Sequence, residues 1–179
     1  ILKSILQRNK LLFRDKRINI IQEKTKNLSK NIKFNRACIN SKEIKKNDIF
    51  FAIKGKKIDA NDFLNEVFKK GSSLSIVNKV NKKFPLNKQI RVKNTLNFLT
   101  ECASSYRNNI DSKIIAITGS CGKTSLKEML KKTFSKFATI SSSPKSFNNK
   151  YGVPLSLFNL NPNHDYGVFE IGMDKEGEI

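Results

Sequence analysis

The stretch KIIAITGSCGKTSLKEML, residues 113–130, decides the fold of this chain. Its first part, 113–118, is a short apolar run rich in β-branched residues, which predicts a buried strand. A glycine-rich segment follows, and apolar residues then recur at helical spacing, which predicts a helix over 124–137. The apolar positions of that helix are Leu126, Met129, Leu130, Phe134 and Phe137. Further strands are expected to begin at 139–140 and to cover 166–171. Strands that alternate with helices predict an α/β domain with a mostly parallel sheet.

The glycine-rich segment between that strand and helix has the context that a phosphate-binding loop requires. Glycines let the backbone approach an anion closely, and successive N–H groups at a helix N-terminus then face it. We therefore predict an ATP-binding loop made of Gly119, Ser120, Cys121, Gly122, Lys123, Thr124 and Ser125. Lys123 is expected to contact the β- and γ-phosphates, and Thr124 to give a hydroxyl ligand to Mg²⁺. The spacing is GxxGKT, whereas the usual loop has four residues between its glycines, and this shorter form indicates a particular class of ATP-using protein.

Residues 1–92 predict a smaller α/β domain. Strands are expected at 48–53 and 74–77, with a helix between them that carries apolar residues on one side. Apolar pairs near the start of the chain, within 1–12, favour a short amphipathic helix. We place the domain boundary near Val92, so that the second domain, 93–179, begins with a helix over 94–106.

The charge of the chain is uneven. The 179 residues carry a net charge of +20, of which +18 falls in 1–93 and +2 in 94–179. An anionic partner of the first half, such as a nucleotide, a nucleic acid or a membrane surface, is one interpretation. The lysines are scattered, however, and no Arg and aromatic residues interleave as in a stacking platform, so solvated lysines without a nucleic-acid partner are favoured.

Two further features bound the class of protein. No apolar run approaches the roughly 18 residues of a membrane helix, so no stable membrane insertion is expected. The three cysteines are odd in number and form no CxxC pair, which fits a reducing cytoplasm and argues against disulfides or a zinc site. The chain starts at Ile rather than Met, so we expect its front end to be incomplete.

Four motifs together resemble one family. ITGSCGKTSLKEML resembles the ATP loop of the Mur ligases, which build the peptide of the peptidoglycan precursor. SFNNKYGVPLSLF at 146–158 and FEIGMDKEGEI at 169–179 resemble the branch of that family that adds the final dipeptide. NSKEIKKNDIFFAIKGKKIDANDF at 40–63 resembles the family's N-terminal domain, and NTLNFLTECASSYR at 94–107 its linker helix. The resemblance covers roughly 36–179, with the motifs in the family's order.

The resemblance implies a cytoplasmic enzyme that uses ATP and Mg²⁺ to form an amide bond through an acyl phosphate. Its implied substrates are UDP-N-acetylmuramoyl-tripeptide and D-alanyl-D-alanine, and its implied roles are cell-wall synthesis, cell shape and cell division. Residues 1–92 would be a UDP-sugar-binding domain and 93–179 a truncated ATP-binding domain, with the C-terminal domain absent. We therefore expect this chain alone to be inactive, and we expect a monomer.

The resemblance also implies roles for individual residues. Catalytic roles fall to Lys123 and Glu170, and the Mg²⁺ ligands would be Thr124 and Glu170. Glu170 also closes a predicted strand, where ligands collect in open α/β sheets. Contacts to the substrates and phosphates would come from Ser41, Lys42, Asn148 and Asn149. Lys42 stands where the family has Arg. Because Lys cannot make the forked contact of Arg, the resemblance supports a contact of Lys42 with the UDP part less strongly than it supports the other roles.

Three alternatives stay open at this point. Another amide ligase with a short loop, such as a folylpolyglutamate synthase, shares the chemistry, although the NNKYGVPL stretch argues against it. A basic nucleic-acid-binding ATPase would explain the charged first half and predicts steeply salt-dependent binding. A nucleotide-binding regulatory module would bind ATP without catalysis.

Overall fold

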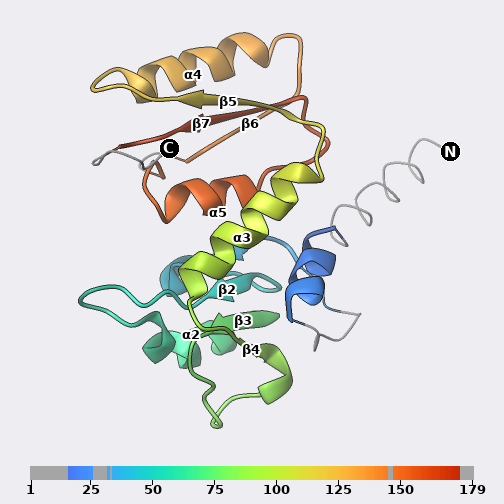
Figure 1. The fold of residues 1–179 in the computed structure, drawn as a ribbon, viewed down its shortest axis with the longest axis vertical. Helices are drawn as coiled ribbons and strands as arrows, with labels where there is room; N and C mark the ends of the chain where they lie inside the picture. Colours follow the sequence, from blue (N-terminus) through green and yellow to red (C-terminus); the bar gives the residue numbers. More distant parts are fainter. Residues whose placement is uncertain (1–15, 26–31, 33, 145–146, 174–179) are drawn as a thin grey trace, which may run out of the picture. The chain divides into compact units, whose positions relative to one another are not determined.

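The computed structural model describes residues 16–25, 32, 34–144 and 147–173 (Figure 1). The chain forms two compact units, Ile1–Tyr106 and Arg107–Ile179. Each unit contains one parallel sheet with helices packed on it, which confirms the predicted α/β class. A helical segment occupies 16–25, whereas the apolar pairs of 1–12 lie outside the described residues. In the part of the chain that the structure describes, no helix is both long enough and apolar enough to span a membrane.

The first unit has a four-stranded sheet in which each strand runs parallel to its neighbours. Its strands, in spatial order, are β1 (Ala37–Cys38), β2 (Ile49–Phe51), β3 (Leu74–Val77) and β4 (Gln89–Arg91). The turns and helices between them are η1 (Ser41–Glu43), η2 (Ala60–Phe63), α2 (Leu64–Lys69) and η3 (Leu86–Lys88). Strands β2 and β3 lie where the sequence predicts them. Strands β1 and β4 were not predicted, because two or three residues are too few to show a period.

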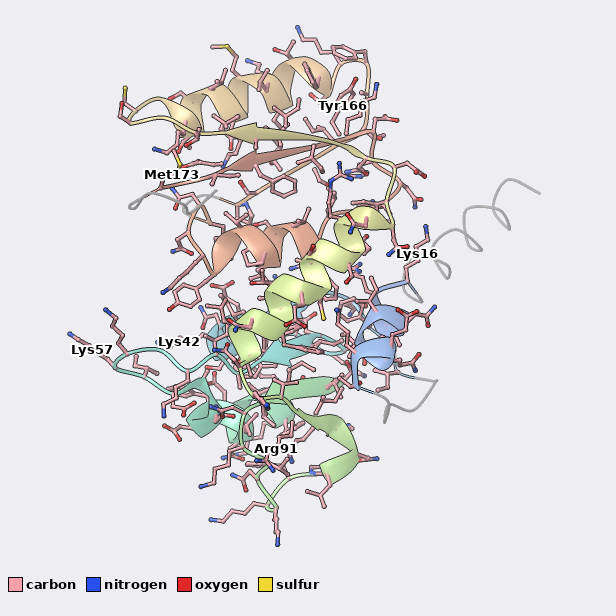
Figure 2. All side chains as sticks on the ribbon, in the orientation of Figure 1. Lys16, Lys42, Lys57, Arg91, Tyr166 and Met173 are labelled. Atoms are coloured by element: carbon pink, nitrogen blue, oxygen red, sulfur yellow. The ribbon has the colours of Figure 1, made fainter. Side chains whose placement is uncertain are left out.

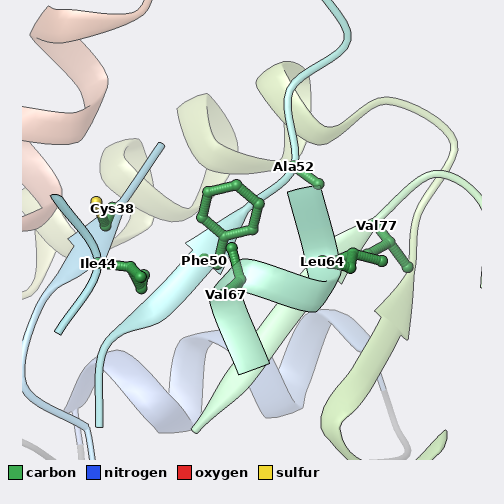
Figure 3. Packing of buried hydrophobic residues seen from close by; sticks show 7 residues of the cluster. All are labelled: Cys38, Ile44, Phe50, Ala52, Leu64, Val67 and Val77. Atoms are coloured by element: carbon green, nitrogen blue, oxygen red, sulfur yellow. The ribbon is translucent and has the colours of Figure 1, made fainter. Parts of the chain in front are cut away.

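Strand β2 is buried on both faces of the sheet. On one face Phe50 packs with α2 in a cluster of buried side chains (Figure 3), which consists of Cys38, Ile44, Phe50, Ala52, Leu64, Val67 and Val77. On the other face the ring of Phe51 lies 6.5 Å from that of Phe98, on helix α3 (Thr95–Asn108). Because helices cover both faces, β2 is apolar at every position instead of alternating.

Helix α3 packs with the first unit, although we placed it in the second domain. Thr95 Oγ1 donates a hydrogen bond of 3.0 Å to the carbonyl oxygen of Ala52, at the end of β2. Tyr106 is fully buried, with the Arg17 guanidinium carbon 5.6 Å from its ring centre. The division therefore falls after Tyr106 and not near Val92, because the side chains that anchor α3 enter the core of the first unit.

The second unit has a three-stranded parallel sheet with one helix on each face (Figure 1). Its strands, in spatial order, are β5 (Lys113–Ile117), β7 (Tyr166–Glu170) and β6 (Ile140–Ser142). Helix α4 (Lys123–Phe134) connects β5 to β6, and helix α5 (Gly152–Phe158) connects β6 to β7. The parallel strands end at one edge of the sheet, where the glycine-rich loop and Glu170 meet.

The buried side of α4 differs from the apolar side that the sequence suggests. Leu126 and Met129 of α4 are 45% and 64% exposed, and Phe137, which follows the helix, is 69% exposed, whereas Lys127 is fully buried. Phe134 does face the sheet, with its ring centre 5.0 Å from that of Tyr166. The helix therefore begins within one residue of the predicted start but ends at Phe134 instead of Phe137, and only part of the predicted apolar residues face the sheet.

Candidate functional site

The loop between β5 and α4 depends on two glycines with positive φ. Gly119 has φ of 144° and Gly122 has φ of 74°, values that residues with a side chain rarely adopt. Gly122 is also the N-cap residue of α4, so the loop ends at the first turn of a helix of 12 residues. The exposed residues of the loop are Gly119, Ser120, Cys121, Gly122 and Ser125. The loop thus offers an open backbone and a helix N-terminus to an anion.

The ammonium of Lys123 lies over this loop. Lys123 is half-buried, and its Nζ donates a hydrogen bond of 2.5 Å to the carbonyl oxygen of Gly119. The side chain therefore folds back across the turn instead of extending into solvent. This arrangement concentrates positive charge where the loop would receive a phosphate.

Thr124 and Glu170 meet although they are 46 residues apart in sequence. Thr124 Oγ1 donates a hydrogen bond of 2.8 Å to Oε2 of Glu170, the last residue of β7. Mg²⁺ in nucleotide sites is usually held by one or two carboxylates together with substrate phosphates, so this pair of oxygen donors fits Mg²⁺. Among the described residues, no group of three or more His, Cys, Asp or Glu side chains could hold a metal. The fit therefore depends on this pair and on phosphate oxygens.

The two asparagines before α5 have different partners. Asn148 Nδ2 donates a hydrogen bond of 2.9 Å to Oε1 of Glu170. The backbone carbonyl oxygen of Asn148 accepts a hydrogen bond of 2.6 Å from the backbone N–H of Gly172. Asn149 Oδ1 instead accepts hydrogen bonds of 3.0 Å from the backbone N–H groups of Tyr151 and Gly152. The structure thus brings Asn148 to the carboxylate, while Asn149 stabilises the start of α5.

Lys127 completes the surroundings of the carboxylate, and sequence reasoning missed it. Its Nζ donates a hydrogen bond of 3.0 Å to the carbonyl oxygen of Ser143 and lies 3.6 Å from Oε2 of Glu170. A lysine is seldom fully buried unless it is paired, so nothing in its identity suggested this position. The one available signal was its spacing, four residues after Lys123 and so on the same side of the helix.

The carboxyl group of Glu170 is held in its charged form. Burial raises the pKa of this group. Hydrogen bonds from Thr124 and Asn148 and the ammonium groups of Lys127 and Lys123 lower the pKa, and together they outweigh the effect of burial. The resulting pKa lies below the ordinary value of 4.5. A metal ligand must be deprotonated, so this environment prepares the carboxylate for a cation at neutral pH.

The predicted substrate contacts Ser41 and Lys42 lie in η1 of the first unit, and Lys42 is labelled in Figure 2. Ser41 Oγ donates a hydrogen bond of 3.0 Å to Glu66 Oε2. Lys70 Nζ donates to the carbonyl oxygens of both η1 residues, at 3.0 Å to Ser41 and 2.9 Å to Lys42. The turn is thus fixed to α2, with the Ser41 side chain buried and the Lys42 side chain exposed.

Comparison with known proteins agrees with this geometry. Residues 117–178, which contain the loop, Asn148 and Glu170, match the model of the Mur ligase middle domain. The chain belongs to the Mur ligase family. It is 36% identical over 152 residues to the UDP-N-acetylmuramoyl-tripeptide–D-alanyl-D-alanine ligase of Rickettsia prowazekii, an alignment that covers 85% of this chain and 34% of that protein.

Two solved structures of Mur ligases are also similar. The UDP-N-acetylmuramoylalanyl-D-glutamyl-2,6-diaminopimelate–D-alanyl-D-alanyl ligase of Acinetobacter baumannii has a TM-score of 0.75 and 31% identity, covering 89% of this chain and 36% of that one. The MurF ligase of Thermotoga maritima, solved in complex with ADP, has a TM-score of 0.69 and 28% identity, covering 83% and 34%. The chain therefore spans about a third of the length of these relatives.

Proposed function

We propose that this chain supplies the sugar-nucleotide and ATP-binding parts of a ligase that joins D-alanyl-D-alanine to UDP-N-acetylmuramoyl-tripeptide in peptidoglycan precursor synthesis. The observation that carries the proposal is the Glu170 carboxylate, which Thr124 and Asn148 hold beside the phosphate loop. The similarity to ligases with this name supports the choice of substrates. The ADP bound to the Thermotoga maritima relative supports the use of ATP.

In this proposal each residue of the loop has a defined task. The backbone from Gly119 to Gly122 receives the phosphates, and Lys123 moves from the Gly119 carbonyl oxygen to the γ-phosphate. Thr124 and Glu170 hold Mg²⁺, which neutralises phosphate charge when bound. Little covalent chemistry is required of the protein, so alignment and charge neutralisation account for the rate.

The proposed reaction proceeds in two balanced steps. A carboxylate oxygen of the tripeptide forms a bond to the γ-phosphorus of ATP, and ADP leaves, which gives an acyl phosphate. The amine of D-alanyl-D-alanine then attacks the acyl carbon, inorganic phosphate leaves, and the amine loses a proton. The first unit is proposed to hold the UDP part, with Ser41 and Lys42 in the turn that receives it.

The test is ATP-dependent phosphate release by the intact gene product. We expect release only when both UDP-N-acetylmuramoyl-tripeptide and D-alanyl-D-alanine are present, and we expect none from the Lys123→Ala variant. Tripeptides that end in diaminopimelate and in lysine should be assayed side by side, to identify the third residue of the peptide substrate. Release that needs neither substrate, or full turnover by Lys123→Ala, would refute the proposal.

We further propose that the protein acts as a cytoplasmic monomer without a nucleic-acid partner. The charge of the first half leaves a basic nucleic-acid-binding ATPase as the second candidate. That candidate predicts filter retention of DNA or RNA that weakens steeply as salt is raised. We expect no retention at physiological salt and a single monomeric species in gel filtration.

A further inference from the structure

Lys127 has an unusual place for a lysine. It lies four residues after Lys123 on α4, and its side chain is fully buried beneath the helix. Removing an ammonium from water is costly unless charged and polar partners replace the water. Such a residue therefore requires a compensating arrangement, and its partners show what that arrangement does.

The partners of Lys127 connect the strand ends at the site. Its Nζ donates to the carbonyl oxygen of Ser143, which follows β6, and lies 3.6 Å from Oε2 of Glu170, which ends β7. Ser143 Oγ in turn accepts a hydrogen bond of 3.2 Å from the backbone N–H of Glu170. Among the residues that the structure describes, one ion-pair partner of Lys127 is exposed: Glu128, whose Oε1 lies 3.6 Å from Nζ and whose side chain is 47% exposed. Three elements are thus joined around one buried ammonium.

The same carboxylate oxygen also accepts from Thr124. Oε2 of Glu170 faces both Thr124 Oγ1, at 2.8 Å, and the Lys127 ammonium. The other oxygen, Oε1, accepts from Asn148. The carboxylate therefore cannot rotate without breaking at least one of these contacts. Its oxygen stays beside the Thr124 hydroxyl, at the separation expected of two ligands of one small cation.

We infer that Lys127 is a positioning residue for the Mg²⁺ site, which acts by fixing the Glu170 carboxylate beside Thr124. The inference rests on the proposed function, because it assigns the site to Mg²⁺ bound with ATP. A positioning role and a purely electrostatic role of Lys127 predict opposite effects of its removal on Mg²⁺ binding. A cation next to the carboxylate repels Mg²⁺, so if Lys127 acted through its charge alone, its removal would strengthen Mg²⁺ binding. If it positions Glu170, its removal weakens Mg²⁺ binding.

The experiment measures how much Mg²⁺ improves ATP binding. ATP is titrated into the intact gene product by calorimetry, once in EDTA and once in saturating Mg²⁺. The dissociation constant in EDTA divided by that in Mg²⁺ gives the factor by which Mg²⁺ improves ATP binding, and this ratio is compared among variants. We expect Lys127→Met to lower this ratio about 10- to 100-fold, the usual effect of losing a group that orients a metal ligand. Binding in EDTA should be unchanged. Lys131→Met, an exposed lysine one turn further along α4, is the matched control and should keep the wild-type ratio.

Each outcome decides the matter. An equal loss of ATP affinity in EDTA and in Mg²⁺ would show a merely structural role, and a raised ratio would show a charge effect; both overturn the inference.

If Lys127→Met does not fold, Lys127→Gln and the double variant Lys127→Met/Glu170→Gln, which leaves no unpaired buried charge, replace it. Adding Lys127→Met to Glu170→Gln should leave the ratio unchanged, and a further decrease would overturn the inference. No Mg²⁺ effect in the wild type would instead refute the proposed function, and the inference with it.

Discussion

Gly152 has no room for a side chain. A Cβ at this position would lie 2.5 Å from Cα, 2.6 Å from the carbonyl carbon and 2.8 Å from Cβ of Phe147. Ordinary contacts begin at 3.4 Å, so the shortest of these is about 0.9 Å too close. Two of the three atoms belong to the backbone, so a change of rotamer cannot relieve the clash. The segment that leads into Asn148 would have to move.

We expect Gly152→Ala to destabilise the second unit by about 2 kcal/mol. Overpacking costs about 1–3 kcal/mol, and a clash with backbone belongs at the upper end of this range. Gly152 is the first residue of α5, where the helix preference of alanine over glycine is smaller than in the middle of a helix, so it offsets only a minor part of the cost. Because Asn148 follows Phe147 directly, the movement also draws the Asn148 amide away from Glu170. The affinity of the Gly152→Ala variant for ATP in the presence of Mg²⁺ should therefore fall together with its free energy of unfolding.

Urea unfolding followed by circular dichroism measures the first effect, and calorimetric titration of ATP the second. Gly55→Ala is the control, since a Cβ there would approach only the carbonyl oxygen of Ile58, at 3.1 Å, and we expect it to cost less than about 1 kcal/mol. If Gly152→Ala were as stable as the wild type, or more stable, the helix preference of alanine would outweigh the clash and the reasoning would be wrong.

Three further predictions concern individual side chains. Lys123→Ala should weaken ATP binding about 10- to 100-fold by calorimetry, since a hydrogen bond to a charged group contributes about 1.5–3 kcal/mol. The pKa of Glu66 is lowered, first by the hydrogen bond from Lys70 and then by that from Ser41, below its ordinary value of 4.5. Glu66 therefore stabilises the first unit above that pH, and the contribution is lost as the pH falls through its lowered pKa. Glu66→Gln should lose less stability than the wild type in urea unfolding as the pH falls below 4.5. Cys121 is exposed while the other two cysteines are buried, so N-ethylmaleimide should label it first; ATP should slow this labelling, as followed by mass spectrometry, and equal rates with and without ATP would place the nucleotide elsewhere.

The sequence predicted the glycine-rich turn between β5 and α4 because its information is local. A β-branched strand, two glycines and a Lys-Thr pair at the start of a helix are all neighbours in the chain. The position of Glu170 could also be predicted, because parallel strands bring their C-terminal ends to one edge. Helix α5 escaped prediction because it has seven residues, with Pro154 as the third, which is too short for a clear helical period.

Lys127 and Ser41 show what a sequence cannot predict on its own. Ser143 follows β6 and Glu170 ends β7, so the burial of Lys127 between these partners depends on how the sheet is assembled. Ser41 was expected to contact the substrate, and this remains a proposal, but its hydroxyl donates to Glu66, which lies 25 residues away. Both contacts arise from tertiary packing, and the residues next to Lys127 and Ser41 in the sequence do not identify the partners.

Asn148 and Asn149 show how one short loop can serve both the fold and the site. They are adjacent and chemically identical, yet only Asn148 reaches the carboxylate, since the other side chain is occupied at the start of α5. The Asn149 side chain stabilises the turn that leads into α5, and Gly152 lets the first turn of the helix lie against Phe147. The position of Asn148 is therefore a consequence of how the next helix begins. A variant that loses the two hydrogen bonds accepted by the Asn149 side chain, such as Asn149→Ala, should consequently weaken ATP binding in the presence of Mg²⁺, although Asn149 itself makes no contact with Glu170 among the hydrogen bonds of the described residues.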